Sequence, residues 1–198
     1  MLEDSTRTAI INKEIETYRK FAVALESLKT VVHTFDGKCF NKNFTKALDD
    51  YLKYGKADRS YHVSAGINNT SFGDFFDINI RCFDDMIKCE TQGSYFQRIN
   101  NSNCSLRINA DDATTKTKSG KYRIKASGII ESFDEKIRYL NDKAVELENG
   151  LREVEAMRAD MEHIKQLMKS FEGKYHARIK DVFNCDYKLK NDSGMQYR

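Results

Sequence analysis

The sequence predicts an α+β protein, with long N- and C-terminal helices forming a coiled-coil rod and a small antiparallel β-sheet in the middle. Two patterns carry this prediction. Apolar residues recur at heptad spacing late in the 198-residue chain, and short central segments alternate apolar with polar residues. The expected parts are N-terminal helices in 1–58, a β-rich module in 59–127, a long coiled-coil helix in 128–173 and a basic tail in 174–198.

The first helix is predicted to start near Ser5 or Thr6. Its apolar positions recur every three or four residues, and further apolar residues widen the stripe. A stripe this wide predicts contact with both another helix and a sheet. Its members are Ile11, Ile15, Tyr18, Phe21, Ala22, Leu25, Leu28 and Val32.

A turn and a second helix should follow. The Asp36-Gly37 dipeptide is a strong turn signal because both residue types tolerate positive φ. A helix then fits 41–54, with Asn41 or Asn43 as its N-cap and Gly55 as its stop.

The middle of the chain has strand-like alternation. Tyr61, Val63 and Ala65 alternate with polar residues, and so do the apolar residues of 76–80. Weaker signals lie at 94–99, 105–108 and 121–126. We expect an antiparallel sheet of about three to five strands, which is a usual size.

The last helix shows the clearest pattern, an apolar seam at strict heptad spacing. The seam comprises Ile130, Phe133, Ile137, Leu140, Ala144, Leu147, Leu151 and Val154, then Met157, Met161, Ile164, Met168 and Phe171 after one three-residue step out of phase. Residues 130–171 would span roughly 62 Å, against roughly 42 Å for 5–33. About 20 Å of seam would then need another cover, which could be the second helix, the segment 174–190 or another subunit.

The charges beside this seam bear on self-association. Lys143 at a g position and Glu148 at an e position would meet in a parallel pair, or would face a helix of the same chain. We predict a homodimer that buries the uncovered part of the seam, near Leu151, Val154, Met161 and Ile164.

No motif in the chain predicts catalysis. GxxxxGK[ST], GxGxxG, GxSxG and HExxH are all absent, and the histidines and cysteines lack the spacing of metal ligands. We therefore expect no enzyme activity, no cofactor and no metal. An enzyme with a dispersed site stays open as an alternative, and a deep pocket gathering His62, Asp77 and Cys82 would favour it.

A basic hairpin around Ser119-Gly120 is a candidate contact for an anion or for nucleic acid. With a two-residue loop, Lys118 would face Lys121 and Lys116 would face Arg123, and all would share one face with Lys125. The alternative is a solvated edge that lysines guard against aggregation. Nucleic-acid binding through this hairpin is our second functional hypothesis.

Composition indicates a cytoplasmic protein that does not enter a membrane. The first four residues lack the basic and apolar regions of a signal peptide. The longest apolar run, Phe21 to Leu25, is far too short to cross a bilayer. The five cysteines include no CxxC pair, as expected of free thiols in a reducing compartment.

The segment from Phe35 to Phe44, followed by Ala47 and Leu48, resembles a segment of uncharacterised small proteins of low-GC bacteria and their phages or mobile elements. The resemblance implies a context and not an activity: small accessory proteins of phages and mobile elements often act by binding a host or phage macromolecule, and anti-CRISPR-like inhibitors of immune nucleases are among them. The predicted function is a non-catalytic interaction protein that binds and modulates a host protein or nucleoprotein.

Overall fold

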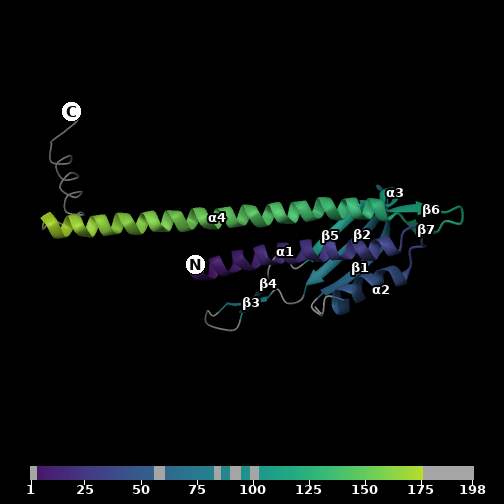
Figure 1. Ribbon diagram of the computed structural model, residues 1–198, viewed down its shortest axis with the longest axis horizontal. Helices are drawn as coiled ribbons and strands as arrows, with labels where there is room; N and C mark the ends of the chain where they lie inside the picture. The colour runs from purple at the N-terminus through teal and green to yellow at the C-terminus, as the bar shows by residue number, and fades with distance from the viewer. Residues whose placement is uncertain (1–3, 56–60, 83–85, 90–94, 99–102, 176–198) are drawn as a thin grey trace, which may run out of the picture. The chain divides into compact units, whose positions relative to one another are not determined.

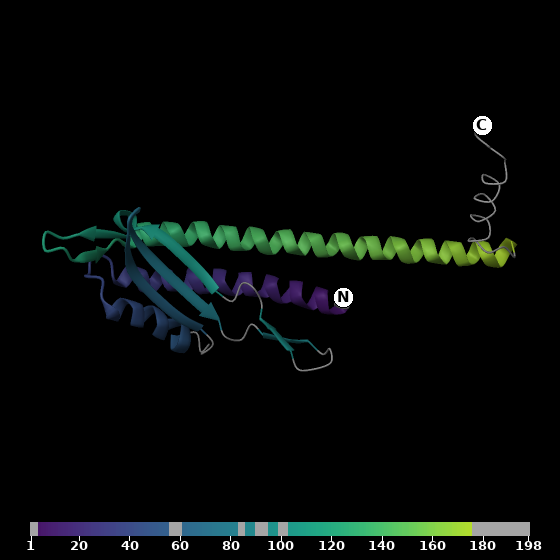
Figure 2. The ribbon, with the colours of Figure 1, turned by 180° about the vertical axis from the view of Figure 1, so that it is seen from behind.

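The computed structural model describes residues 4–55, 61–82, 86–89, 95–98 and 103–175, and it divides into two units between Asn149 and Gly150. It is a mixed α and β structure with a small antiparallel sheet, seen from two sides in Figure 1 and Figure 2. The elements are α1 Asp4–Thr34, α2 Lys42–Asp50, the π-helical turn η1 Tyr51–Gly55, β1 Tyr61–Thr70, β2 Gly73–Cys82, β3 Met86–Cys89, β4 Tyr95–Arg98, β5 Asn103–Asn109, α3 Ala110–Ala113, β6 Thr114–Lys116, β7 Tyr122–Ile124 and α4 Ala126–Tyr175.

The main sheet has the order β1-β2-β5, with both neighbouring pairs antiparallel. Val63 pairs with Ile80, and Ile80 also pairs with Cys104, so these three side chains share the buried face. Residues between them point to the other face, which is largely polar. The alternation predicted for β1, β2 and β5 is therefore confirmed, while β3–β4 and β6–β7 form separate two-stranded ladders.

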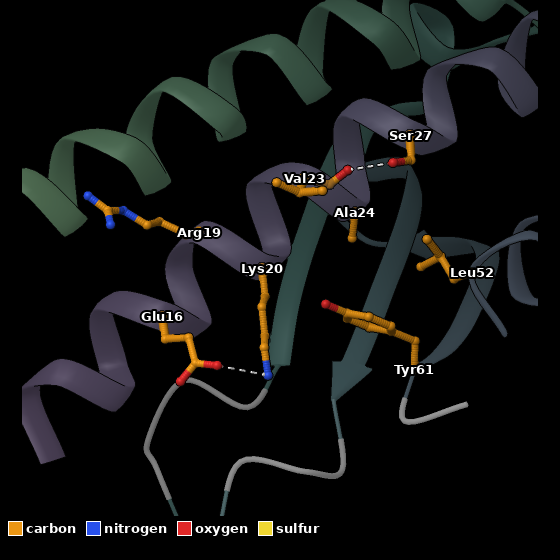
Figure 3. A pocket seen from close by; sticks show the side chains of 8 residues that line it. All are labelled: Glu16, Arg19, Lys20, Val23, Ala24, Ser27, Leu52 and Tyr61. Atoms are coloured by element: carbon orange, nitrogen blue, oxygen red, sulfur yellow. Dashed lines mark hydrogen bonds and ion pairs between the residues drawn. The ribbon is translucent and has the colours of Figure 1, made fainter. Parts of the chain in front are cut away.

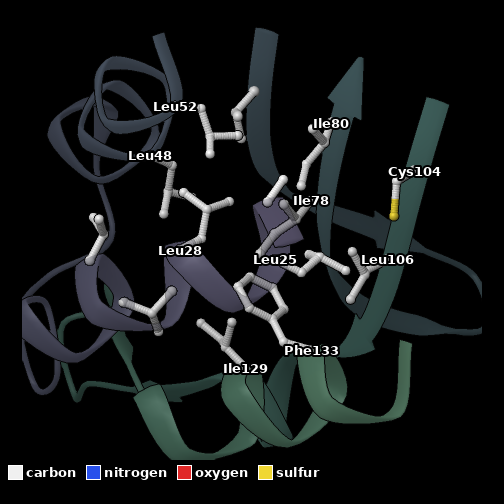
Figure 4. Close-up of a cluster of buried hydrophobic side chains, with 14 of the residues drawn as sticks. Leu25, Leu28, Leu48, Leu52, Ile78, Ile80, Cys104, Leu106, Ile129 and Phe133 are labelled. Atoms are coloured by element: carbon white, nitrogen blue, oxygen red, sulfur yellow. The ribbon is translucent and has the colours of Figure 1, made fainter. Parts of the chain in front are cut away.

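The core of the first unit lies between the main sheet and the helices (Figure 4). Leu25 and Leu28 of α1 are fully buried against side chains of α2, of β2 and of the first turns of α4. Phe133 supplies the largest apolar side chain from α4 in this cluster. The width of the α1 stripe thus correctly predicted contact with both helices and sheet.

Helix α2 starts as its sequence predicts and covers the outer edge of β1. The Asn41 side chain accepts a hydrogen bond of 2.8 Å from the Asn43 N–H, so Asn41 is the N-cap. On the edge strand, the Val63 N–H donates to Asp49 at 2.7 Å, and the Thr45 hydroxyl donates to the Ala65 carbonyl at 3.3 Å. These bonds satisfy backbone groups that an edge strand otherwise leaves open.

The segment 36–40 ties the hairpin to the start of α4. Its backbone pairs with β7: the Phe40 N–H donates to the Tyr122 carbonyl at 2.8 Å, and the Ile124 N–H donates to the Lys38 carbonyl at 2.9 Å. The Asp36 carboxylate accepts the N–H of Ala126 at 2.8 Å, which is one of the unpaired donors at the helix start. The Asp36-Gly37 turn thus positions the backbone of 38–40 beside β7 and the Asp36 carboxylate at the start of α4.

Two expectations about the whole chain meet the structure only in part. The long last helix exists as α4, but a coiled-coil pairing and the four-part division of the chain stay predictions. Most of the predicted basic tail, from residue 176 onward, lies outside the described residues. No helix in the described ranges combines the length and the apolar character that spanning a bilayer would require.

Candidate interaction surfaces

The C-terminal part of α4 carries a continuous apolar seam that is exposed in the single chain. Val154 is 44% exposed, Met157 63%, Met161 61% and Ile164 54%, and Met168 and Phe171 continue the row. Leu151, at its beginning, is partly buried. This part of the seam is therefore exposed among the described residues, and what covers it stays a prediction.

The heptad frame of this seam follows from the three-residue step after Val154. Val154, Met161 and Met168 take a positions, and Met157, Ile164 and Phe171 take d positions. The flanking e positions hold Arg158, Lys165 and Glu172, whereas the flanking g positions hold Glu153, Asp160 and Leu167. From residue 153 to residue 165 the seam thus has one basic border and one acidic border.

The N-terminal part of α4 uses its charges within the chain. Arg19 of α1 pairs with Glu148, and Lys29 of α1 pairs with Asp134 at 2.5 Å. Lys143 binds Glu146 one turn along its own helix at 2.5 Å. The partner of α4 in this part is therefore α1, and the predicted meeting of Lys143 with Glu148 of a second chain is not needed here.

The basic hairpin forms, but its predicted register is wrong by one residue. Lys116 pairs with Tyr122, and Arg123 pairs with Thr115 rather than with Lys116. The loop is Lys118-Ser119-Gly120, closed by the Gly120 N–H donating to the Thr117 carbonyl at 2.9 Å. A two-residue type I′ loop requires positive φ at both positions, whereas this loop requires it at Gly120 alone, where φ is 77°.

The new register divides the five basic residues between faces. Lys116 shares a face with Tyr122, its ammonium lying 5.3 Å from the ring centroid and 3.9 Å from Asp74. Lys121 and Arg123 lie on the opposite face by strand alternation. Lys118, Lys121, Arg123 and Lys125 are all exposed, and no ion pair to any of them lies within the described ranges.

The proposed catalytic constellation of His62, Asp77 and Cys82 does not form. Cys82 lies on the buried face of the sheet, whereas His62 and Asp77 lie on the other face. Asp77 binds Arg107 Nε at 2.9 Å and also accepts from Asn68, while His62 Nδ1 lies 3.2 Å from Asp49. Strand alternation therefore separates the groups that this enzyme alternative required.

The pKa values of Asp77, Asp49 and Cys104 at the sheet are shifted by hydrogen bonds and burial within the fold. Hydrogen bonds from Arg107, and next from Asn68, outweigh partial burial and hold the pKa of Asp77 below its ordinary value. Burial opposes ionisation of Asp49, but bonds from Lys53 and the Val63 N–H still lower its pKa. Burial raises the pKa of the Cys104 thiol to about 11, so this cysteine behaves as a small apolar residue.

A hollow of about 420 Å³ lies between α1, η1 and β1 (Figure 3). Ala24, Leu52 and Tyr61 form its floor, and an ion pair of 3.3 Å between Glu16 and Lys20 closes one end. Sequence reasoning missed this hollow, whose signal is the small pair Ala24 and Ser27 one turn apart within an otherwise bulky helix face. Among the described residues that line it, none is a nucleophile with an adjacent base.

The described ranges also contain no cluster of three histidine, cysteine or acidic side chains arranged to hold a metal ion. No protein-family model, no curated protein and no solved structure matches the chain.

Proposed function

We propose that the protein is a non-catalytic interaction protein whose α4 seam, Val154 to Phe171, binds a helix of a partner. The single observation that carries the proposal is the exposure of this seam. Met157 and Met161 each leave more than half of their accessible surface in water. Large apolar residues repeated along one helix face are the mark of a helix-to-helix interface rather than of a solvated surface.

Energetics support such a partner. Burying one large apolar side chain contributes about 1.5–3 kcal/mol, so a row of them exceeds the usual cost of association. Methionine is unbranched and fits varied partners, which suits a binding surface. We keep the proposal that the protein binds and modulates a host protein or nucleoprotein, and the proposal for the seam is only that a helix of another chain covers it. If the protein binds none of a panel of bacterial immune nucleases, that result would count against the proposal that it inhibits such a nuclease.

The test is site-specific photocrosslinking in the cells that express the full chain. A photoreactive phenylalanine analogue replaces Met161 on the seam, or Gln166 on the opposite side of the helix as a matched control. We expect adducts of higher mass from position 161 only, identified by peptide mass spectrometry. Absence of any intermolecular adduct from position 161 would contradict the proposal.

As a second candidate function, we propose weak nucleic-acid binding by the hairpin. Support comes from exposed cations on one face, Lys121 and Arg123, without acidic partners in the described ranges. With Lys125 they could neutralise three phosphates, which gives a slope of log affinity against log salt of about −2.7 on duplex DNA. A gel shift at low salt tests this, with Lys121→Glu/Arg123→Glu as the variant that should abolish it. No shift at micromolar wild-type protein would remove the idea.

A further inference from the structure

We infer that the helix that covers the seam is that of a second copy of this chain, parallel and in register over residues 150–171. This inference rests on the proposed function, since it names the partner of the same surface.

The charges that border the seam are self-complementary in the parallel arrangement. In a parallel pair, each g residue meets the e residue five positions later on the other chain. Glu153 then meets Arg158, and Asp160 meets Lys165. Twofold symmetry makes each pair occur twice, so four opposite-charge contacts flank one short seam.

The antiparallel arrangement of the same two chains is disfavoured by these charges. There, g positions face g positions and e positions face e positions. The acidic border with Glu153 and Asp160 would then meet itself, and so would the basic border with Arg158 and Lys165. One sequence thus attracts its copy in one orientation and repels it in the other, which is how coiled coils select partners.

The core positions accept a copy without a polar mismatch. All a and d positions from Val154 to Phe171 are apolar, so no charged or amide side chain would be buried without a partner. The segment is already helical as part of α4, so pairing does not carry the cost of helix nucleation. A seam of only two to three heptads predicts a reversible dimer with a dissociation constant in the micromolar range.

Orientation and register are tested by disulfide crosslinking of the full chain. Ile164→Cys places a thiol at a d position, where a parallel in-register pair brings the two copies into the same layer, within reach of a disulfide. We expect mild oxidation to yield a 164–164 crosslink, mapped by peptide mass spectrometry above the background of the native cysteines. Ala159→Cys, on the outer face, is the matched control and should give none. Absence of the 164–164 bond would overturn the inference.

Charge reversal tests the partner by affinity. Glu153→Lys/Asp160→Lys makes both borders basic, and we expect the dimer dissociation constant to rise at least about tenfold, which corresponds to ~1.4 kcal/mol. Mixing this variant with Arg158→Glu/Lys165→Glu, whose borders are both acidic, should restore dimers as mixed pairs. Analytical sedimentation across about 1–100 µM protein measures the dissociation constant of the variant and the formation of mixed dimers. Circular dichroism checks that these surface changes leave the fold intact.

The outcomes separate this inference from the function on which it rests. If the wild type stays monomeric while position 161 crosslinks to another protein, the inferred homodimer is rejected and the proposal that the seam binds a partner helix is retained. A monomer whose position 161 crosslinks only to residues of its own chain overturns both.

Discussion

At the scale of single residues, Gly128 is the glycine of the described ranges where an added methyl group would meet the closest contact. Its backbone lies so close to α3 that an added Cβ would sit 1.9 Å from the Asp112 carbonyl oxygen. That contact is with backbone, which cannot rotate away as a long side chain can. Nothing in the heptad pattern of the sequence marks this glycine, because the approach comes from a segment outside the helix.

Gly128→Ala should therefore destabilise the protein by about 1–3 kcal/mol, the usual cost of overpacking. Thermal unfolding followed by circular dichroism measures it. The matched control is Gly150→Ala in the same helix, where an added Cβ meets nothing within 4 Å. The control should leave stability unchanged or raise it by up to about 1 kcal/mol through helix propensity. Equal effects at both positions would contradict the packing argument.

Asp77 gives a second prediction at this scale, with a sign set by its lowered pKa. Because Arg107 and then Asn68 hold the folded-state pKa below its unfolded value, the carboxylate stabilises the fold above that unfolded value. This contribution is lost as the pH falls through the folded-state pKa. Arg107 is largely exposed, so the contribution is modest.

Asp77→Asn should lower the free energy of unfolding at pH 7 by about 1 kcal/mol, and the difference from the wild type should shrink near pH 2. Urea unfolding at the two pH values measures this. Glu155→Gln, at an exposed carboxylate of α4, is the control and should leave the free energy of unfolding at pH 7 close to that of the wild type. A difference that stays constant between the two pH values would show that packing, not charge, explains the effect.

At the scale of elements, sequence predicted what local chemistry decides. Asn41 was one of two proposed caps, and the structure selects it because its side chain reaches the N–H of Asn43. Burial of β1, β2 and β5 followed from alternation, since one face of each strand must pack. These features depend on neighbours in the chain, which the sequence displays directly.

Predictions from the sequence failed for the register of the hairpin and for one proposed site. The hairpin register missed by one residue because Ser119 disfavours the positive φ that the shorter loop would require. The site of His62, Asp77 and Cys82 failed for a different reason. One residue of offset along a strand moves a side chain to the other face, so Cys82, which is in phase with the buried Ile78 and Ile80, is separated from Asp77.

The segment 36–40 supplies the prediction for this scale. Asp36→Ala removes the carboxylate that accepts the Ala126 N–H and so leaves a donor at the start of α4 without its side-chain partner. We expect a loss of about 1 kcal/mol, as for other helix caps, in chemical unfolding. Asp36→Asn retains an acceptor oxygen and should recover most of the loss. If Asp36→Asn lowers the free energy of unfolding as much as Asp36→Ala does, the carboxylate stabilises the helix through its charge rather than as a hydrogen-bond acceptor.

At the scale of the whole molecule, the buried apolar cluster and the exposed apolar row of α4 occupy different parts of the chain. Within the described ranges, every member of the buried apolar cluster lies in the first unit, and the last of them along the chain is Leu140. The exposed apolar row begins at Val154 and lies entirely in the second unit. Helix α4 continues through both, so one helix first packs in the core and then presents an apolar face.

A chain that ends at Asn149 should therefore fold by itself and lose self-association. It keeps the whole apolar cluster and the pairs from α1 to Asp134 and Glu148. We expect the shortened chain to keep a near-ultraviolet circular dichroism signal, which reports fixed tertiary structure. Its thermal midpoint should fall by no more than about 4 °C, the shift that roughly 1 kcal/mol causes in a domain of this size. Light scattering should report a monomer at concentrations where the full chain dimerises. Loss of fixed tertiary structure in the shortened chain would show that residues after 149 contribute to the core, and a persistent dimer would place the interface in the first unit.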